Sequence, residues 1–383
     1  MTNKNNCDII KLYSIDEYYF SKIFYGALKM SKTYVYIGRF QPFHNGHYNV
    51  CLSALKEADK LLIVIGSINK ARDTKNPFSF EERKKMILES LNPTISSYLN
   101  KGIKKTISIV GIEDYPYNNN KWLLAVQDAV GCNNDDSNIF LTGFKKPETG
   151  EYLDYFPQWK NALVSQNEYL SNIHATLIRE KFLFDDFSLL NKENFNFLVP
   201  EIVNEFLYKF TRANKIQYEN LRNENLFIIK YRSQFINLKY KVPFLTADTL
   251  VVCCGHVLLV ERKNYPGKGL LAIPGGFVDS EIDYDQIDCG LRELKEETKL
   301  KVPLPVLKGS IVKTLDFSDP ERSLRWRIFT KAILIMLPDM KLPTVKGSDD
   351  AKRAFWIPIS KIVLNKNKFF EDHFHIIQTL LSI

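Results

Sequence analysis

Two histidines in the first third of the chain have the spacing of a phosphate-binding turn. His44 and His47 frame the sequence His-Asn-Gly-His, which follows an apolar run at 33–38 and precedes a helix-compatible segment at 48–58. A strand that opens into a turn at a helix N-terminus presents backbone N–H groups and the positive end of the helix dipole to an anion. The two imidazoles add donors for phosphate oxygens. The pattern therefore predicts a polyphosphate site.

A second phosphate-binding pattern occurs much later in the chain. Thr176 and Arg179 form the sequence T-x-x-R at a predicted helix start. There a hydroxyl can cap the helix, and a guanidinium can hold phosphate with two parallel hydrogen bonds. The two patterns together are much more specific than either pattern alone. For the histidine pattern alone, the plain alternative is a surface turn with two titrating histidines.

A third pattern places three carboxylates on one face of a helix. Glu293, Glu296 and Glu297 lie at positions i, i+3 and i+4, which are neighbours on a helix surface. Such charges repel one another unless a cation such as Mg²⁺ or Mn²⁺ joins them, and the ion can then bridge a diphosphate and activate water. The alternative is a solvated acidic helix face. The Pro-Gly-Gly sequence that precedes the helix favours the metal site.

Composition narrows the class of protein further. The 383 residues suffice for two domains, with 45% hydrophobic and 25% charged residues. The net charge of +8 suits anionic small molecules, but the absence of a basic run or zinc-finger pattern argues against nucleic acid. Six cysteines without CxxC spacing indicate reduced thiols in a cytoplasmic protein. We expect no membrane contact, because no apolar run is long enough to span a bilayer. Whether the chain forms a homo-oligomer is left open by the sequence.

The first half alternates strand and helix patterns. Continuous apolar strands separated by helices predict a doubly wound parallel sheet over residues 31–210, with ligands beyond the carboxyl ends of the strands. Residues 1–30 are an extension of unknown role. The predicted strands are 34–38, 61–67, 106–112 and 139–142, and the predicted helices are 48–58, 79–90, 122–130 and a helical region within 171–210.

The character of the sequence changes after a connecting segment at 211–240. Short β-like runs and one strong helix predict an α+β domain over residues 241–383. The runs around Gly255 suggest a hairpin. The predicted strands are 250–254, 256–260, 309–315, 326–335 and 354–356, and the predicted helix is 284–298.

The stretch GRFQPFHNGH, together with T-x-x-R, resembles the HxGH nucleotidyltransferase superfamily. More specifically, residues 31–210 resemble the archaeal-type nicotinamide-mononucleotide adenylyltransferases, including bifunctional bacterial proteins that carry this domain. The resemblance implies a Rossmann-like fold and adenylyl transfer from ATP to nicotinamide mononucleotide, giving NAD and pyrophosphate with Mg²⁺. It implies that His44, His47 and Arg179 hold the ATP phosphates. The implied nucleotide cradle comprises Gly38, Arg39, Phe40, Gln41, Gly46 and Thr176.

The same resemblance implies a pocket for the nicotinamide nucleotide. Asn119 and Trp122 fall where the family contacts this substrate, with Trp122 stacking on the ring. Lys75 falls near the phosphate of the mononucleotide, where the family has an arginine. The plain alternatives are a core tryptophan and a solvated loop lysine.

The segment from Gly275 to Thr298 resembles the Nudix box. Gly275, Gly276, Glu281 and Arg292 match its loop, but fifteen residues separate Gly276 from Arg292, two more than in the box, so Glu281 cannot satisfy both of its spacings. Thr298 replaces a glycine. The resemblance implies that Glu293, Glu296 and Glu297 hold Mg²⁺, with Mn²⁺ as an alternative. It also implies that ADP-ribose is cleaved to AMP and ribose 5-phosphate.

Two other functions stay open from the residues alone. The first domain could be a different adenylyl or cytidylyl transferase that acts on a flavin or pantetheine nucleotide. Asn119 and Trp122 argue for a flat heteroaromatic ring in the substrate without deciding which one. The second domain could be a ligand sensor without catalysis, because its box is altered. Retention of all three helix glutamates argues against the sensor, and the lack of a helix-turn-helix segment argues against a DNA-binding regulator.

Overall fold

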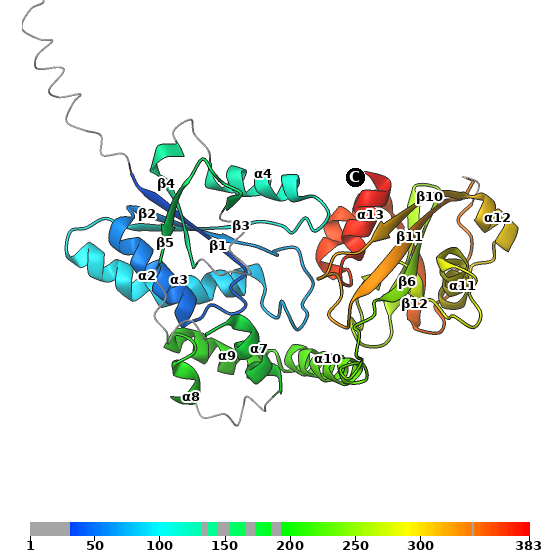
Figure 1. The fold of residues 1–383 in the computed structure, drawn as a ribbon, viewed down its shortest axis with the longest axis horizontal. Helices are drawn as coiled ribbons and strands as arrows, with labels where there is room; N and C mark the ends of the chain where they lie inside the picture. Colours follow the sequence, from blue (N-terminus) through cyan, green and yellow to red (C-terminus); the bar gives the residue numbers. More distant parts are fainter. Residues whose placement is uncertain (1–30, 132–135, 145–153, 165–172, 185–192, 339–340) are drawn as a thin grey trace, which may run out of the picture.

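A computed structural model describes residues 31–131, 136–144, 154–164, 173–184, 193–338 and 341–383. The predicted extension at 1–30 lies outside the described residues. The chain folds around two separate sheets, which lie at opposite ends of the view in Figure 1. Within the described ranges, no helix is both long enough and apolar enough to cross a lipid bilayer.

The first sheet consists of parallel strands in the order β3-β2-β1-β4-β5. Four of these strands confirm the predicted apolar runs. The fifth was missed because it is short and begins with Lys-Asn. The bounds are β1 (Thr33–Gly38), β2 (Lys60–Ile65), β3 (Thr106–Gly111), β4 (Ile139–Gly143) and β5 (Lys160–Leu163).

Helices cover both faces of this sheet, as a doubly wound fold requires. Along β1, Tyr34 and Tyr36 pack with α2 (Asn45–Glu57) and α3 (Phe80–Asn100), whereas Val35 and Ile37 pack with α4 (Asn119–Val130) on the other face (Figure 1). Since the strands are parallel, the segments that follow β1 and β2 meet at one edge. That edge carries the predicted phosphate site.

A group of helices joins the first sheet to the second. They are α7 (Ala175–Phe184), α8 (Glu193–Asn196), α9 (Glu201–Ala213) and α10 (Lys215–Ser233). The segment 211–240, predicted as a connection, is therefore mostly helical. Its helix α10 buries one face through Tyr218, Leu221, Glu224 and Ile228, and it runs from the first part of the molecule towards the second (Figure 1).

The second sheet is mixed, with the order β10-β11-β6-β7-β12 and two short strands at its side. The predicted hairpin around Gly255 is confirmed, because Cys253 pairs with His256. The bounds are β6 (Phe244–Cys253), β7 (His256–Arg262), β8 (Leu271–Ala272), β9 (Gly275–Phe277), β10 (Ile311–Phe317), β11 (Ile328–Met336) and β12 (Ala351–Pro358).

Two helices pack on opposite faces of the second sheet. The predicted acidic helix is α11 (Gln286–Thr298), whose Leu291 and Leu294 meet Val251. On the other face α13 (His373–Leu381) packs on the sheet and is turned towards the first part of the molecule (Figure 1). The remaining elements are α12 (Leu304–Gly309) and 3₁₀ turns at Asp136–Asn138, Ile359–Lys361 and Val363–Lys368.

Close packing of α11 on the sheet depends on Gly290. A methyl group on Gly290 would lie 2.6 Å from both Ile333 Cδ1 and Thr249 Oγ1. We therefore predict that Gly290→Ala lowers the free energy of unfolding by about 1–3 kcal/mol, because an overpacked core strains its neighbours. Urea titration measures this change. Gly309→Ala is the matched control, since nothing lies within 4 Å of its new methyl group; equal stability of both variants would contradict the packing argument.

Candidate active sites

The two predicted histidines lock each other at the start of α2. His44 is the N-cap, and its Nδ1 accepts the backbone N–H of His47 at 3.4 Å. His47 Nδ1 accepts the backbone N–H of His44 at 3.3 Å, and the two rings stack with centroids 3.6 Å apart. Because both Nδ1 atoms accept, each neutral ring carries its proton on Nε2. The turn therefore fixes the tautomer suited to donating to a phosphate oxygen.

Two glycines of the predicted cradle are required by the aromatic rings beside them. A Cβ on Gly38 would lie 2.9 Å from the ring of Phe40, and a Cβ on Gly46 would lie 2.9 Å from the ring of His44. Phe40 itself is buried with a φ of 52°, in the left-handed region. These residues shape the turn by letting side-chain rings pack directly on the backbone.

Helix α7 brings Arg179 to the histidine turn. Its Nη1 donates to the carbonyl oxygen of Gln41 at 2.9 Å, and its Nη2 donates to Thr176 Oγ1 at 3.1 Å. Burial, and then the nearby charge of Arg39, lowers the pKa of Arg179 to about 10. Arg179 therefore contacts the loop that leads into the histidine turn, whereas neither histidine is among the described residues that line the cavity holding Arg179. A shared phosphate site for the two patterns stays a prediction.

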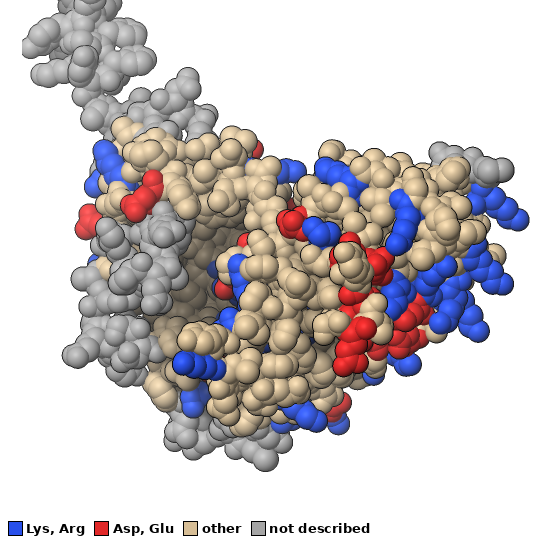
Figure 2. Space-filling model, turned by 45° about the vertical axis from the view of Figure 1, so that its right-hand side comes forward, with Lys and Arg blue, Asp and Glu red and all other residues tan. Residues whose placement is uncertain are grey.

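A cavity of about 600 Å³ collects the cationic residues of this region. Arg39, Lys75, Thr176 and Arg179 all line it. Figure 2 shows a hollow in the first part of the molecule with Lys and Arg side chains at its edge. A polyphosphate entering such a cavity would meet several positive charges at once.

Gln41 holds the loop after β1 in place. Its side chain is buried, donates to the carbonyl of Phe78 at 2.8 Å and accepts the N–H of Phe78 at 3.0 Å. This pair of bonds ties the loop after β1 to the segment before α3. The predicted direct contact of Gln41 with ATP stays a prediction.

Sequence reasoning missed Arg83, which holds two loops of the site together. Arg83 Nη1 donates to the carbonyls of Arg39 at 2.7 Å and Gly66 at 2.8 Å. Its side chain is almost fully buried, and this burial lowers its pKa to about 10. A charged residue in the first turn of a helix is usually solvent-exposed, so the sequence offered no signal for this role.

The predicted nicotinamide contacts lie apart from Lys75. Asn119 is exposed at the start of α4, and Trp122 is half-buried with its ring centroid 6.0 Å from that of Phe156. The cavity that holds Lys75 includes neither of them among its described lining residues. Trp122 therefore packs partly as a core residue, and the mononucleotide role of this pair stays a prediction.

The acidic helix lines a second cavity, of about 540 Å³. Glu293 and Glu297 line this cavity, whereas Glu296 is not among its described lining residues and its side chain is 43% exposed. Glu297 accepts the backbone N–H of Gly275 at 3.1 Å, and burial raises its pKa to about 8. Burial also raises the pKa of Glu293. A Cβ on Gly276 would lie 2.4 Å from the Glu293 carboxylate and displace it, and a Cβ on Gly275 would lie 2.2 Å from the backbone oxygen of Ala247, so glycine is required at position 275.

Arg292 is held by three carboxylates, one of which the sequence reasoning missed. It donates to Glu293 at 2.8 Å, to Glu296 at 2.9 Å and to Asp283 at 2.8 and 2.9 Å. These bonds hold the pKa of Asp283 below its ordinary range. Glu281 is exposed and bonds through its backbone N–H to Asp279. The two additional loop residues thus place Asp283, rather than Glu281, beside the box arginine.

The carboxylates of α11 fit a hard divalent cation in their chemistry, but those of Glu293 and Glu296 are bonded to Arg292. Oxygen donors are the ligands that Mg²⁺ and Mn²⁺ take. In the described part of the chain, no three carboxylate, histidine or cysteine side chains are gathered closely enough to hold a metal ion. Binding of a metal here would therefore require Glu296 or Glu293 to leave the guanidinium.

Comparisons with known proteins agree with both halves. The Cytidylyltransferase-like family matches residues 35–123, and the NUDIX domain family matches residues 244–380. The nicotinamide/nicotinic acid mononucleotide adenylyltransferase of Acinetobacter baylyi is 35% identical over 39% of this chain and 73% of its own length. The ADP-ribose pyrophosphatase of Methanocaldococcus jannaschii is 29% identical over 39% of this chain and 88% of its own.

A solved structure aligns with nearly the whole chain. The bifunctional NMN adenylyltransferase/ADP ribose pyrophosphatase of Francisella tularensis is 34% identical, covers 92% of this chain and 99% of its own, and has a TM-score of 0.81. The chain belongs to this bifunctional family. A second structure from that organism, complexed with AMP and a Mn ion, is 32% identical with the same coverage and a TM-score of 0.79. The predicted family and fold class of both domains are thereby confirmed.

For the Nudix domain of this bifunctional chain, the Asp283 contact generates a test. We predict that Asp283→Asn slows ADP-ribose hydrolysis about 10- to 100-fold, the usual effect of losing a residue that orients metal-site carboxylates. NAD synthesis should not change. Asp288→Asn is the matched control, because Asp288 lies on α11 and pairs at the surface with Lys308 of α12. Equal hydrolysis by both variants would show that Asp283 does not orient Arg292 for catalysis.

Proposed function

We propose that the chain joins two reactions of NAD metabolism. Residues 31–210 transfer the adenylyl group of ATP to nicotinamide mononucleotide, and residues 241–383, joined through 211–240, hydrolyse ADP-ribose to AMP and ribose 5-phosphate. The observation that carries the proposal is that both halves of the chain align with one relative, a bifunctional NMN adenylyltransferase/ADP ribose pyrophosphatase. These relatives favour nicotinamide mononucleotide over a flavin or pantetheine nucleotide.

The first reaction requires no covalent intermediate on the protein. A phosphate oxygen of the mononucleotide attacks the α-phosphorus of ATP, one P–O bond forms, and the bond to the departing pyrophosphate breaks. The work left to the chain is positioning and neutralisation of negative charge. His44, His47 and Arg179 hold the phosphates of ATP, and a divalent cation, Mg²⁺ by our proposal, supplies further neutralisation. Arg83 positions the loops that carry these groups.

In the second reaction water cleaves the diphosphate of ADP-ribose. Glu293, Glu296 and Glu297 would hold the divalent cation, Mg²⁺ or Mn²⁺, which supplies charge neutralisation and a more acidic water. Burial raises the pKa of Glu297, and a bound cation would favour the ionised carboxylate over the protonated one. The N–H of Gly275 and the fork of Arg292 keep the carboxylates on one side of the cavity. We propose that the partners are small nucleotides and that the protein acts in the cytoplasm.

Two substitutions separate the proposed sites. We predict that His47→Ala reduces NAD synthesis at least about 100-fold while ADP-ribose hydrolysis persists, because one donor for the growing charge is lost. Glu297→Gln should do the reverse, because the neutral amide is a poor metal ligand. Product separation by HPLC measures both reactions in each variant.

Matched controls come from the same residue types outside both cavities. His256→Ala at the hairpin and Glu205→Gln on the exposed face of α9 should keep both activities. Loss of both activities in His47→Ala or in Glu297→Gln, with the fold intact by circular dichroism, would contradict the assignment of one reaction to each domain.

A further inference from the structure

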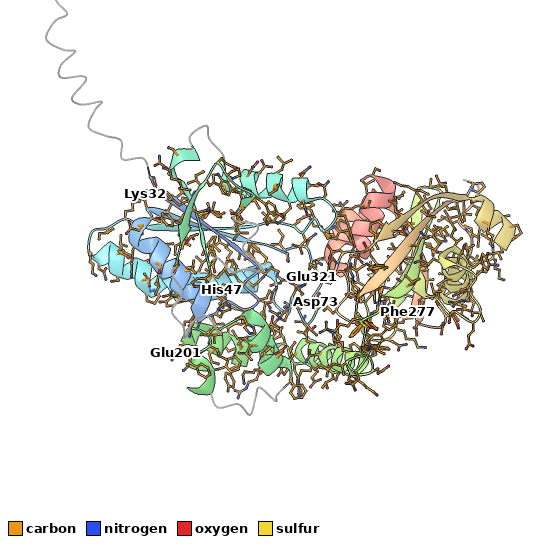
Figure 3. All side chains as sticks on the ribbon, in the orientation of Figure 1. Lys32, His47, Asp73, Glu201, Phe277 and Glu321 are labelled. Carbon is orange, nitrogen blue, oxygen red and sulfur yellow. The ribbon has the colours of Figure 1, made fainter. Side chains whose placement is uncertain are left out.

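One segment of the Nudix domain reaches into the cavity of the transferase. The segment 319–325 follows β10 and contributes Pro320, Glu321, Ser323 and Leu324 to the lining of the cavity that also holds Arg39 and Arg179. Figure 3 places Glu321 near Asp73, in the region between the two sheets. The two residues are far apart in the sequence and belong to different domains. The transferase cavity is therefore completed by the other domain.

Glu321 puts a negative charge among the cations of this cavity. Its carboxylate forms an ion pair with Lys75. The bond from Lys75, followed by the charges of Arg39 and Lys70, holds the pKa of Glu321 below its ordinary range. Lys75 retains only 20% of its side-chain exposure, whereas Glu321 retains 71%. The lysine is thus set in the wall, and the carboxylate approaches it from the solvent side.

Lys75 is also the residue that the family resemblance places near the phosphate of the mononucleotide. A carboxylate and a phosphate monoester present the same chemistry to an ammonium group, namely anionic oxygens at hydrogen-bonding distance. Both cannot hold the same ammonium equally well. We propose that Glu321, supplied by the Nudix domain, occupies the position of the substrate phosphate beside Lys75 and is displaced when the mononucleotide binds. This inference rests on the proposed function of the first domain.

The residues after Glu321 show why its side chain, rather than the whole segment, moves. Arg322 is buried and donates to both oxygens of Asp372 at 3.0 Å. Arg325 pairs with Glu371 at 3.6 Å and lies over the ring of Phe277. These anchors fix the backbone on the Nudix side. The exposed Glu321 side chain can rotate away from Lys75 without breaking either of them.

The exchange predicts that Glu321 weakens substrate binding and leaves chemistry alone. Glu321→Gln should lower KM for nicotinamide mononucleotide about twofold to fivefold, the range that a partly exposed ion pair supports. The kcat of NAD synthesis and the rate of ADP-ribose hydrolysis should stay within about twofold, because ground-state competition alone is removed. Asp316→Asn is the matched control, since Asp316 pairs with Lys331 in the same domain, outside the cavity.

A double-mutant cycle tests whether the effect passes through Lys75. In a Lys75→Met background, Glu321→Gln should no longer change KM. An unchanged or raised KM in the single variant would overturn the proposal, the latter by showing that Glu321 orients Lys75 for the substrate. Failure of the proposed function can be distinguished from failure of this inference, because even the wild-type chain would then make no NAD. Calorimetric titration with inorganic phosphate would in that case still decide whether Glu321→Gln tightens anion binding and whether Lys75→Met cancels the gain.

Discussion

The buried ion pair between Arg322 and Asp372 of the Nudix domain lies at the contact with the transferase domain and anchors the segment that carries Glu321. Asp372 also accepts a hydrogen bond from Tyr117, which belongs to the transferase domain and packs edge-on to Phe317 at 4.9 Å. A buried charge pair is costly unless each group is fully bonded, and here the partners come from both domains. Tyr117 of the transferase domain therefore helps to satisfy a buried carboxylate of the Nudix domain. The same carboxylate anchors Arg322, next to Glu321.

The two sites handle diphosphate chemistry with opposite charges. The transferase cavity presents cations such as Arg39 and Arg179 directly to an anion. His44 and His47 are not among its described lining residues and are locked by their own helix cap. The Nudix cavity instead gathers carboxylates, visible as an acidic area flanked by basic residues in Figure 2, and needs a cation to turn repulsion into binding. Arg292 balances Glu293 and Glu296 while no cation is bound.

Local patterns were predictable from the sequence, whereas contacts made by the tertiary fold were not. The histidine turn and the three glutamates of α11 depend on spacing within one turn of chain, so the residues alone disclosed them. Asp283 could have been suggested by counting the enlarged loop. Arg83 and Glu321 could not, because each acts on a segment that only folding brings near. Trp122 shows the reverse, since this residue predicted to bind substrate is partly buried and packs against a core cluster that includes Phe156.

The most direct test of this account is to assay the purified wild-type chain for both reactions with a divalent cation present. One sample receives ATP and nicotinamide mononucleotide, and a second receives ADP-ribose, with the products separated by HPLC. We predict NAD in the first sample and AMP with ribose 5-phosphate in the second. A folded chain that produces no NAD would contradict the transferase assignment. A chain that binds ADP-ribose without cleaving it would contradict the catalytic role given to the glutamates of α11.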